Sequence, residues 1–143
     1  LMILSKYDSR IRYELDFFPN KFFVAIQSNE NLISFKIENQ RISIINNDID
    51  ADLIIGVKDS HLLFEMLIGK ISLHQGFAEN RFIIKGNLFL ALKFIRILYI
   101  SQSYLFCKST LEKIQKNNPE FEIDKITFYK KLFSGGNDDN TIF

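Results

Sequence analysis

The chain has 143 residues, with 18 basic and 17 acidic side chains and a net charge of +1. This length is typical of one domain, and the near-neutral charge excludes the strong positive field that nucleic-acid binding requires. Hydrophobic residues make up 47% of the chain, and 15 of its residues are phenylalanine. We therefore expect either a Phe-rich core or a cavity walled by Phe.

The first twenty residues are predicted to form one helix, which Pro19 and Asn20 would end. Alternating polar and apolar residues over 10–17 offer a strand as the alternative, but the longer helical window is the stronger signal. The apolar positions at helical spacing are Leu4, Tyr7, Ile11, Leu15 and Phe18.

Four strands are predicted next, over 21–28, 32–38, 41–45 and 52–58. Their first connectors are short and rich in Asn, which predicts hairpins and an antiparallel meander. Alternation of apolar and polar residues in the second strand indicates a sheet that is covered on one face and exposed to solvent on the other. The first strand is apolar on both faces, which is typical of a central position. The expected inner-face residues are Ile33, Phe35, Ile37, Ile42, Ile44, Leu53, Ile55 and Val57.

The segment 51–100 is predicted to continue as strand, two short helices, strand and long helix. Asp59 and Ser60 are candidate N-caps for a helix over 60–68, and Ser72 for one over 73–78. A fifth strand follows over 81–85.

Asn87 is the candidate cap of the long helix, whose apolar run over 88–100 is shorter than a membrane span. We expect Lys93 and Arg96 to face away from the apolar stripe of this helix. The expected stripe holds Leu88, Ala91, Leu92, Ile95 and Leu98.

The last third of the chain is predicted to be helical. A capping box over 109–112 would open a short helix that ends at 117–119, and a second amphipathic helix is expected over 124–133. These helices either dock over an opening as a lid or pack on the exterior. The predicted organisation is an N-terminal helix (1–20), a core (21–106), a C-terminal helical extension or lid (107–133) and a disordered tail (134–143).

Catalytic and metal-binding motifs are not recognisable in the sequence. His61, His74 and Cys107 cannot supply the usual zinc ligand sets, and adjacent Ser60 and His61 would point in different directions on a helix. We therefore expect no enzyme activity, no metal and no cofactor. The single cysteine fits a reducing compartment, so we expect a cytoplasmic protein, and the Ile, Asn and Lys usage indicates a bacterial one.

One stretch carries a family resemblance. It contains Gly69-Lys70, Ser72, Phe77, Arg81-Phe82, Ile84-Lys85-Gly86-Asn87 and Leu90-Ala91. In these features the chain resembles the sterol carrier protein-2 family, and the likeness extends over roughly residues 14–100. Asn80 stands where a glycine is frequent in the family, although Asn also tolerates the left-handed conformation. The acidic run of bacterial members that assist ubiquinone biosynthesis is replaced by Asn87-Leu88-Phe89.

The resemblance implies an α+β fold in which helices cover one face of a five-stranded, antiparallel-rich sheet. An apolar tunnel would hold a fatty-acyl, sterol, phospholipid or isoprenoid ligand, and a membrane or a lipid enzyme would be a transient partner. Ligand contacts are expected from Leu63, Met66, Leu67, Phe77, Phe82, Ile84, Leu88, Ala91, Leu92 and Ile95.

Two alternatives to a lipid carrier stay open. The first is an accessory subunit of a lipid or isoprenoid biosynthetic complex, with a filled core. The second is an esterase with a polar cluster around Ser60, His61 or Cys107. The oligomeric state is not predicted.

Overall fold

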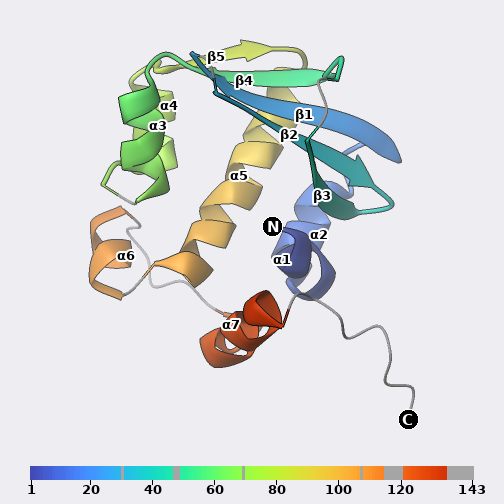
Figure 1. Cartoon of the computed structure of the whole chain (residues 1–143), viewed down its shortest axis with the longest axis vertical. Helices are drawn as coiled ribbons and strands as arrows, with labels where there is room; N and C mark the ends of the chain where they lie inside the picture. The colour runs from blue at the N-terminus through green and yellow to red at the C-terminus, as the bar shows by residue number, and fades with distance from the viewer. Residues whose placement is uncertain (30, 47–48, 69, 107, 115–120, 135–143) are drawn as a thin grey trace.

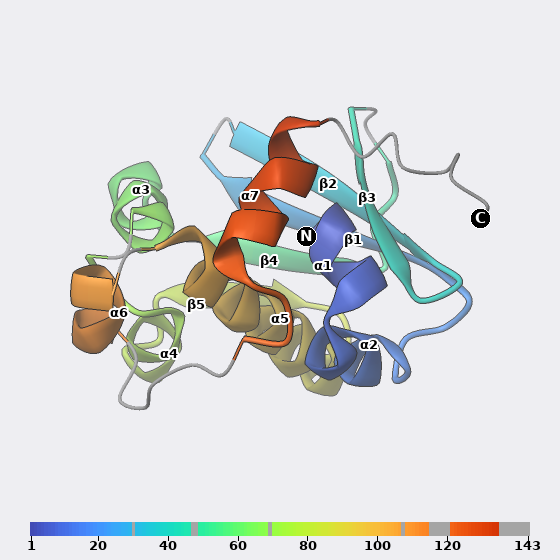
Figure 2. The same ribbon diagram turned by 90° about the horizontal axis from the view of Figure 1, so that it is seen from below.

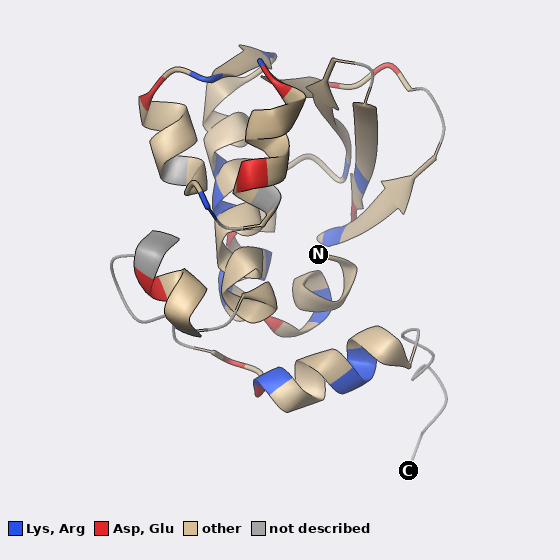
Figure 3. Ribbon diagram, turned by 60° about the vertical axis from the view of Figure 1, so that its left-hand side comes forward, with Lys and Arg blue, Asp and Glu red and all other residues tan. Residues whose placement is uncertain are grey.

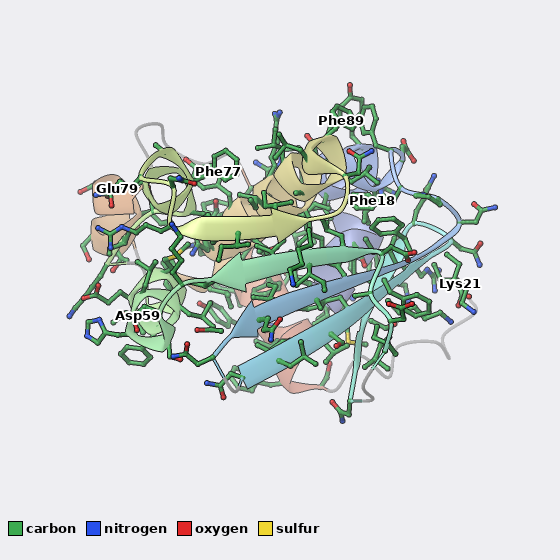
Figure 4. The ribbon with its side chains drawn as sticks, turned by 90° about the horizontal axis from the view of Figure 1, so that it is seen from above. Phe18, Lys21, Asp59, Phe77, Glu79 and Phe89 are labelled. Atoms are coloured by element: carbon green, nitrogen blue, oxygen red, sulfur yellow. The ribbon has the colours of Figure 1, made fainter. Side chains whose placement is uncertain are left out.

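The computed structural model describes residues 1–29, 31–46, 49–68, 70–106, 108–114 and 121–134. A five-stranded sheet forms the top layer in Figure 1, and the helices lie beneath it. Figure 4 shows the other face of the sheet, where the strands lie in front of the helices. This is the predicted α+β architecture, with helices on one face of the sheet.

The strand order explains how the sheet is buried. It is β3-β2-β1-β4-β5, so β1 is central, as its two apolar faces predict. β4 does not continue the meander beside β3. It pairs in parallel with β1, and Val24 lies opposite Leu53. The predicted meander is therefore wrong after its third strand, because the doubly apolar β1 takes a neighbour on each side. The strands are β1 (Lys21–Ser28), β2 (Asn31–Glu38), β3 (Arg41–Ile45), β4 (Leu53–Val57) and β5 (Phe82–Lys85).

The register confirms the predicted inner face. Val24 lies opposite both Phe35 and Leu53, and Ile55 lies opposite Ile84. Cross-strand partners share a face, so these side chains form one apolar layer over which the helices pack.

The single N-terminal helix is wrong: the segment forms α1 (Met2–Tyr7) and α2 (Ser9–Leu15). Asp8 between them has an extended backbone, and its carboxylate accepts hydrogen bonds from the backbone N–H groups of Arg10 and Ile11. An N-cap of this kind starts a new helix at Ser9. The predicted apolar positions Leu4, Ile11, Leu15 and Phe18 are nevertheless buried.

The next helices begin at the predicted caps, which are Asp59, Ser72 and Asn87. Gly86, directly before Asn87, has a φ of 117°, and a Cβ there would lie 2.6 Å from the carbonyl oxygen of Asp52. Asn80 has a φ of 55°, so it adopts the left-handed conformation that Asn tolerates. The helices are α3 (Ser60–Leu67), α4 (Leu73–Ala78) and α5 (Leu88–Leu105).

The apolar stripe predicted for α5 is confirmed at Ala91 and Ile95, which are buried, and is wrong at its outer edge. Leu88 is 55% exposed and Leu92 is 44% exposed. The helix has apolar residues on several sides, and the sheet and α1–α2 select a neighbouring row. That row adds Leu90, Phe94, Ile97, Ser101 and Tyr104 to the buried side of the helix.

The basic residues of α5 have a buried partner. Lys93 Nζ lies 2.9 Å and Arg96 Nε 3.0 Å from the carboxylate of Glu14 in α2, which is 2% exposed. The ammonium group of Lys93 also lies 3.9 Å from the centre of the Phe17 ring. These contacts fix α2 against the first half of α5.

By length and hydropathy, α5 is able to cross a membrane, but 56% of it is buried inside the domain. Figure 2 shows it running across the inner face of the sheet. We therefore describe α5 as the core helix of the domain.

The C-terminal helices are α6 (Lys108–Ile114) and α7 (Lys125–Phe133). The predicted capping box is wrong, because Lys108 is already helical and Ser109 lies inside the helix. Asp124 caps α7 by accepting a hydrogen bond from the N–H of Thr127. The predicted stop at 117–119 and the tail after Ser134 lie outside the described residues.

Charged residues are distributed over several helices, as Figure 3 shows. Among the described residues, no group of three His, Cys, Asp or Glu side chains is placed to hold a metal ion.

Candidate functional site

A cavity of about 310 Å³ lies between the inner face of the sheet and helices α3, α4 and α5. Its wall has no charged side chain among the residues that the structure describes, and Ser101 and Gln102 are the polar residues on it. The strands contribute Ile26, Ile33, Phe35, Ile44, Ile55, Val57 and Phe82. The remaining lining residues are Leu1, Leu63, Met66, Leu73, Ile95, Leu98, Ser101, Gln102, Leu105 and Phe106. A volume of this size and an apolar wall are typical of a small-molecule site.

Four residues predicted to contact a ligand line this cavity: Leu63, Met66, Phe82 and Ile95. They come from three different elements, so the fold brings together side chains that are up to 32 positions apart in the sequence. The structure places these four in one wall, and their contact with a ligand stays a prediction.

The other predicted contacts lie elsewhere. Ala91 is fully buried in the core, and Ile84 is half-buried against it. Phe77 and Leu92 do not line the cavity but a neighbouring pocket, which shares Ile95 with it, and Phe77 lies on the outer side of the domain in Figure 4. Leu88 lies at the surface. The side chain of Leu67 lies outside the described ones.

Sequence reasoning missed several wall residues. The alternation of the strands places Ile55 and Val57 on the inner face, so these could have been included. Gln102 gave no such signal, because it is polar and lies beyond the predicted end of the helix at Ile100.

A second hollow of about 460 Å³ lies between α1, β3 and α7, and we call it the outer groove. It shares four lining residues with the cavity, so the two hollows adjoin. α1 and α7 lie side by side in Figures 1 and 2 and contact each other. Lys6 and Lys131 also line the groove. The shared residues are Leu1, Ile44, Ser101 and Leu105.

Helix α7 is held over this groove by specific contacts. Phe128 is buried and its ring centre lies 5.3 Å from that of Tyr104 in α5. The hydroxyl of Tyr129 donates to the carbonyl oxygens of Tyr104 and Leu105, at 3.2 and 3.1 Å. Lys131 Nζ lies 3.3 Å from the hydroxyl of Tyr7 in α1. α7 therefore bridges α1 and the end of α5.

A buried polar cluster lies behind α7. The Tyr104 hydroxyl donates to Asp8, and Arg10 Nη2 donates to the same carboxylate at 2.6 Å. Burial raises the pKa of Tyr104, and the Asp8 carboxylate raises it further, so the phenol stays protonated. The backbone N–H of Glu122 donates to the Tyr104 oxygen at 3.3 Å.

Ser60 and His61, the candidate nucleophile and base of an esterase, contact different partners. Ser60 Oγ accepts hydrogen bonds from Ser28 and Asn29, whereas His61 lies 3.7 Å from Glu65 one turn along α3. Ser60 and His61 therefore do not form a catalytic pair in the described part of the chain. Cys107 and the side chain of His74 lie outside it.

Comparison with solved structures finds similar folds. The UbiJ-SCP2 ubiquinone synthesis protein superposes with a TM-score of 0.50 at 9% identity, covering 71% of this chain and 84% of that one. Sterol Carrier Protein 2 Like 2 from Aedes aegypti has a TM-score of 0.37 at 10% identity, covering 66% and 95%. Sterol Carrier Protein 2 from Yarrowia lipolytica, in its apo form, has a TM-score of 0.37 at 20% identity, covering 64% and 76%.

Comparison with curated proteins gives no match. The model of the SCP-2 sterol transfer family matches residues 4–99, which is more than half of the chain and confirms the resemblance seen in the sequence. The chain belongs to the SCP-2 sterol transfer family.

Proposed function

We propose that this protein is a non-enzymatic carrier that shields the apolar part of a lipid in the cavity between the sheet and α5. The observation that supports this most strongly is the cavity of about 310 Å³, whose described lining holds no charged side chain. Each methylene transferred from water into such a cavity contributes about 0.8 kcal/mol, so a long chain can bind with few polar contacts.

The outer groove supplies the route to the cavity in this proposal. The shared lining residues Ile44, Ser101 and Leu105 lie where the two hollows meet. A ligand entering between α1 and α7 would pass these residues. The cavity alone is at the lower end of typical ligand-site volumes, and the adjoining groove would accommodate the rest of a longer lipid.

Helix α7 acts as the lid in this account. Its Phe128, Lys131 and Leu132 line the outer groove, so its position controls how wide the groove is. The contacts of Tyr129 and Lys131 would have to break when the lid opens. Exterior packing without a gating role is the competing interpretation.

An accessory role in a lipid or isoprenoid biosynthetic complex is the second candidate. The similarity of the fold to a ubiquinone synthesis protein favours this role. At 9% sequence identity, the similarity concerns the fold alone. The version of this role with a filled core does not fit a cavity of 310 Å³.

The test is native mass spectrometry of the purified chain, followed by organic extraction and lipid analysis. A carrier is expected to show a stoichiometric lipid adduct or to acquire one from added lipid. A chain that carries no lipid and takes up none would contradict the carrier function and favour the accessory role.

A further inference from the structure

A buried amide on α5 has a partner for its nitrogen but none for its oxygen among the described residues. Gln102 is 8% exposed and lines the cavity. Its Nε2 donates a hydrogen bond of 3.0 Å to the carbonyl oxygen of Met66 in α3. This bond fixes the direction of the amide, because the reversed amide would place two acceptors together. Its Oε1 is buried and has no donor among the described residues.

An acceptor buried without a donor is costly, so it needs a partner. The neighbouring wall offers none, since Ile95, Leu98 and Leu105 are apolar. The hydroxyl of Ser101 donates instead to the carbonyl oxygen of Ile97, at 2.8 Å. The described wall therefore leaves Oε1 to a donor in the cavity, which is a water molecule when the cavity holds no ligand and a ligand group when it does.

The geometry points to Gln102 as the hydrogen-bond acceptor for a ligand hydroxyl, which makes a neutral lipid alcohol the ligand class of this cavity. This inference rests on the proposed carrier function. An alcohol donates the hydrogen bond that Oε1 lacks and brings no charge into the apolar wall. An ionised carboxylate has no proton to donate, and no lining side chain among the described residues carries a positive charge for it.

The inference also gives the orientation of the ligand. Ser101 lines both the cavity and the outer groove, whereas Gln102 lines only the cavity. The hydroxyl end therefore enters first, and the hydrocarbon extends toward the groove. The competing arrangement places an anionic head outward, beside Lys6 and Lys131.

Three probes of equal chain length separate these arrangements: hexadecanol, hexadecyl methyl ether and palmitate. Their affinities are measured by displacement of a bound fluorescent hydrocarbon at mildly alkaline pH. We expect hexadecanol to bind about fivefold more tightly than the ether, the ratio given by one ordinary hydrogen bond, and palmitate to bind most weakly.

Gln102→Leu should remove the preference for the alcohol and leave affinity for the ether within about twofold. Ser101→Ala, one residue away on the same wall, is the matched control and should keep the preference. Equal affinities for alcohol and ether in the unmodified chain would overturn the inference, as would loss of the preference in Ser101→Ala alone. Tight palmitate binding that is insensitive to Gln102→Leu would overturn it in favour of the outward anionic head.

Gln102→Leu also removes the donor to Met66, so a measurement without substitution is needed. In the ¹⁵N spectrum of the unmodified protein, the side-chain amide of Gln102 should shift with hexadecanol and not with the ether. Identical shifts with both would contradict the inference. Failure of all three probes to bind would instead contradict the carrier function itself.

Discussion

The hydroxyl of Tyr104 donates a hydrogen bond of 2.6 Å to Oδ2 of Asp8, which lies 96 residues earlier in the chain. Both side chains are fully buried. The same carboxylate caps α2 and pairs with Arg10, and the Tyr104 ring packs on Phe128 of α7. One contact thus connects both N-terminal helices, the end of the core helix and the proposed lid.

Tyr104→Phe removes the donor and leaves the shape of the side chain unchanged. The buried carboxylate of Asp8 loses one partner, so the free energy of unfolding should fall by about 1–3 kcal/mol. Denaturant titration measures this change. Tyr13→Phe is the control, because Tyr13 is exposed and its loss should cost below about 0.5 kcal/mol. Equal effects of the two variants would contradict the role given to the Tyr104 hydroxyl.

Stability should depend on the ionisation of Asp8. Burial would raise the pKa of this carboxyl group, but hydrogen bonds from Arg10 and Tyr104 and the charge of Arg10 outweigh burial and lower it. Because the folded pKa lies below the unfolded one, the stabilisation is present above the unfolded pKa and is lost as the pH falls through the folded pKa.

The free energy of unfolding should therefore decrease as the pH is lowered below about 4. Asp8→Asn should be less stable at neutral pH and show a shallower decrease in acid. Thermal unfolding of both proteins across this pH range measures the difference. An unchanged acid slope in Asp8→Asn would mean that other carboxylates control the acid response.

Gly86 should be required for the turn before α5. Its positive φ and the 2.6 Å approach of a Cβ to the Asp52 carbonyl predict that Gly86→Ala destabilises the fold by about 1–3 kcal/mol. Gly56→Ala is the control, because a Cβ there would meet Ile83 at an ordinary 3.4 Å. Comparison of the two denaturation midpoints tests the point, and a smaller loss for Gly86→Ala than for Gly56→Ala would contradict it.

Phe128→Ala tests the lid. Removal of this buried ring weakens the contact of α7 with Tyr104, so lipid should transfer to acceptor vesicles several-fold faster. Ile126→Ala on the same helix is the control, because Ile126 is exposed. Stopped-flow transfer of a fluorescent lipid gives both rates. Equal rates would indicate that α7 packs on the exterior without gating.

Local chemistry made much of the fold predictable. The caps Asp59, Ser72 and Asn87 are encoded by single side chains, and the alternation in β2 determines its inner face. The break at Asp8 was missed, because helical spacing continues across it while the N-cap acts over only three residues.

Strand pairing and helix packing between distant segments were harder to predict from the sequence. The parallel pairing of β4 with β1 brings together strands that are separated by two others, and no local pattern specifies it. Periodicity alone assigns Lys93 and Arg96 to water, whereas in the structure both pair with the buried carboxylate of Glu14. Periodicity also does not distinguish the core from the cavity wall, so Ala91, which is buried in the core, is predicted as a wall residue.

The most direct test of the carrier function compares two leucines on α5. Leu98 lines the cavity, whereas Leu92 is exposed and is not part of the cavity lining. Leu98→Trp should fill the cavity and lower the affinity for lipid at least tenfold, a loss of about 1.4 kcal/mol in binding free energy. Leu92→Trp should bind lipid with the affinity of the unmodified chain. Uptake is measured by titration with a fluorescent lipid, with circular dichroism as the check on folding. Unchanged uptake in a folded Leu98→Trp, or loss in Leu92→Trp alone, would contradict binding in this cavity.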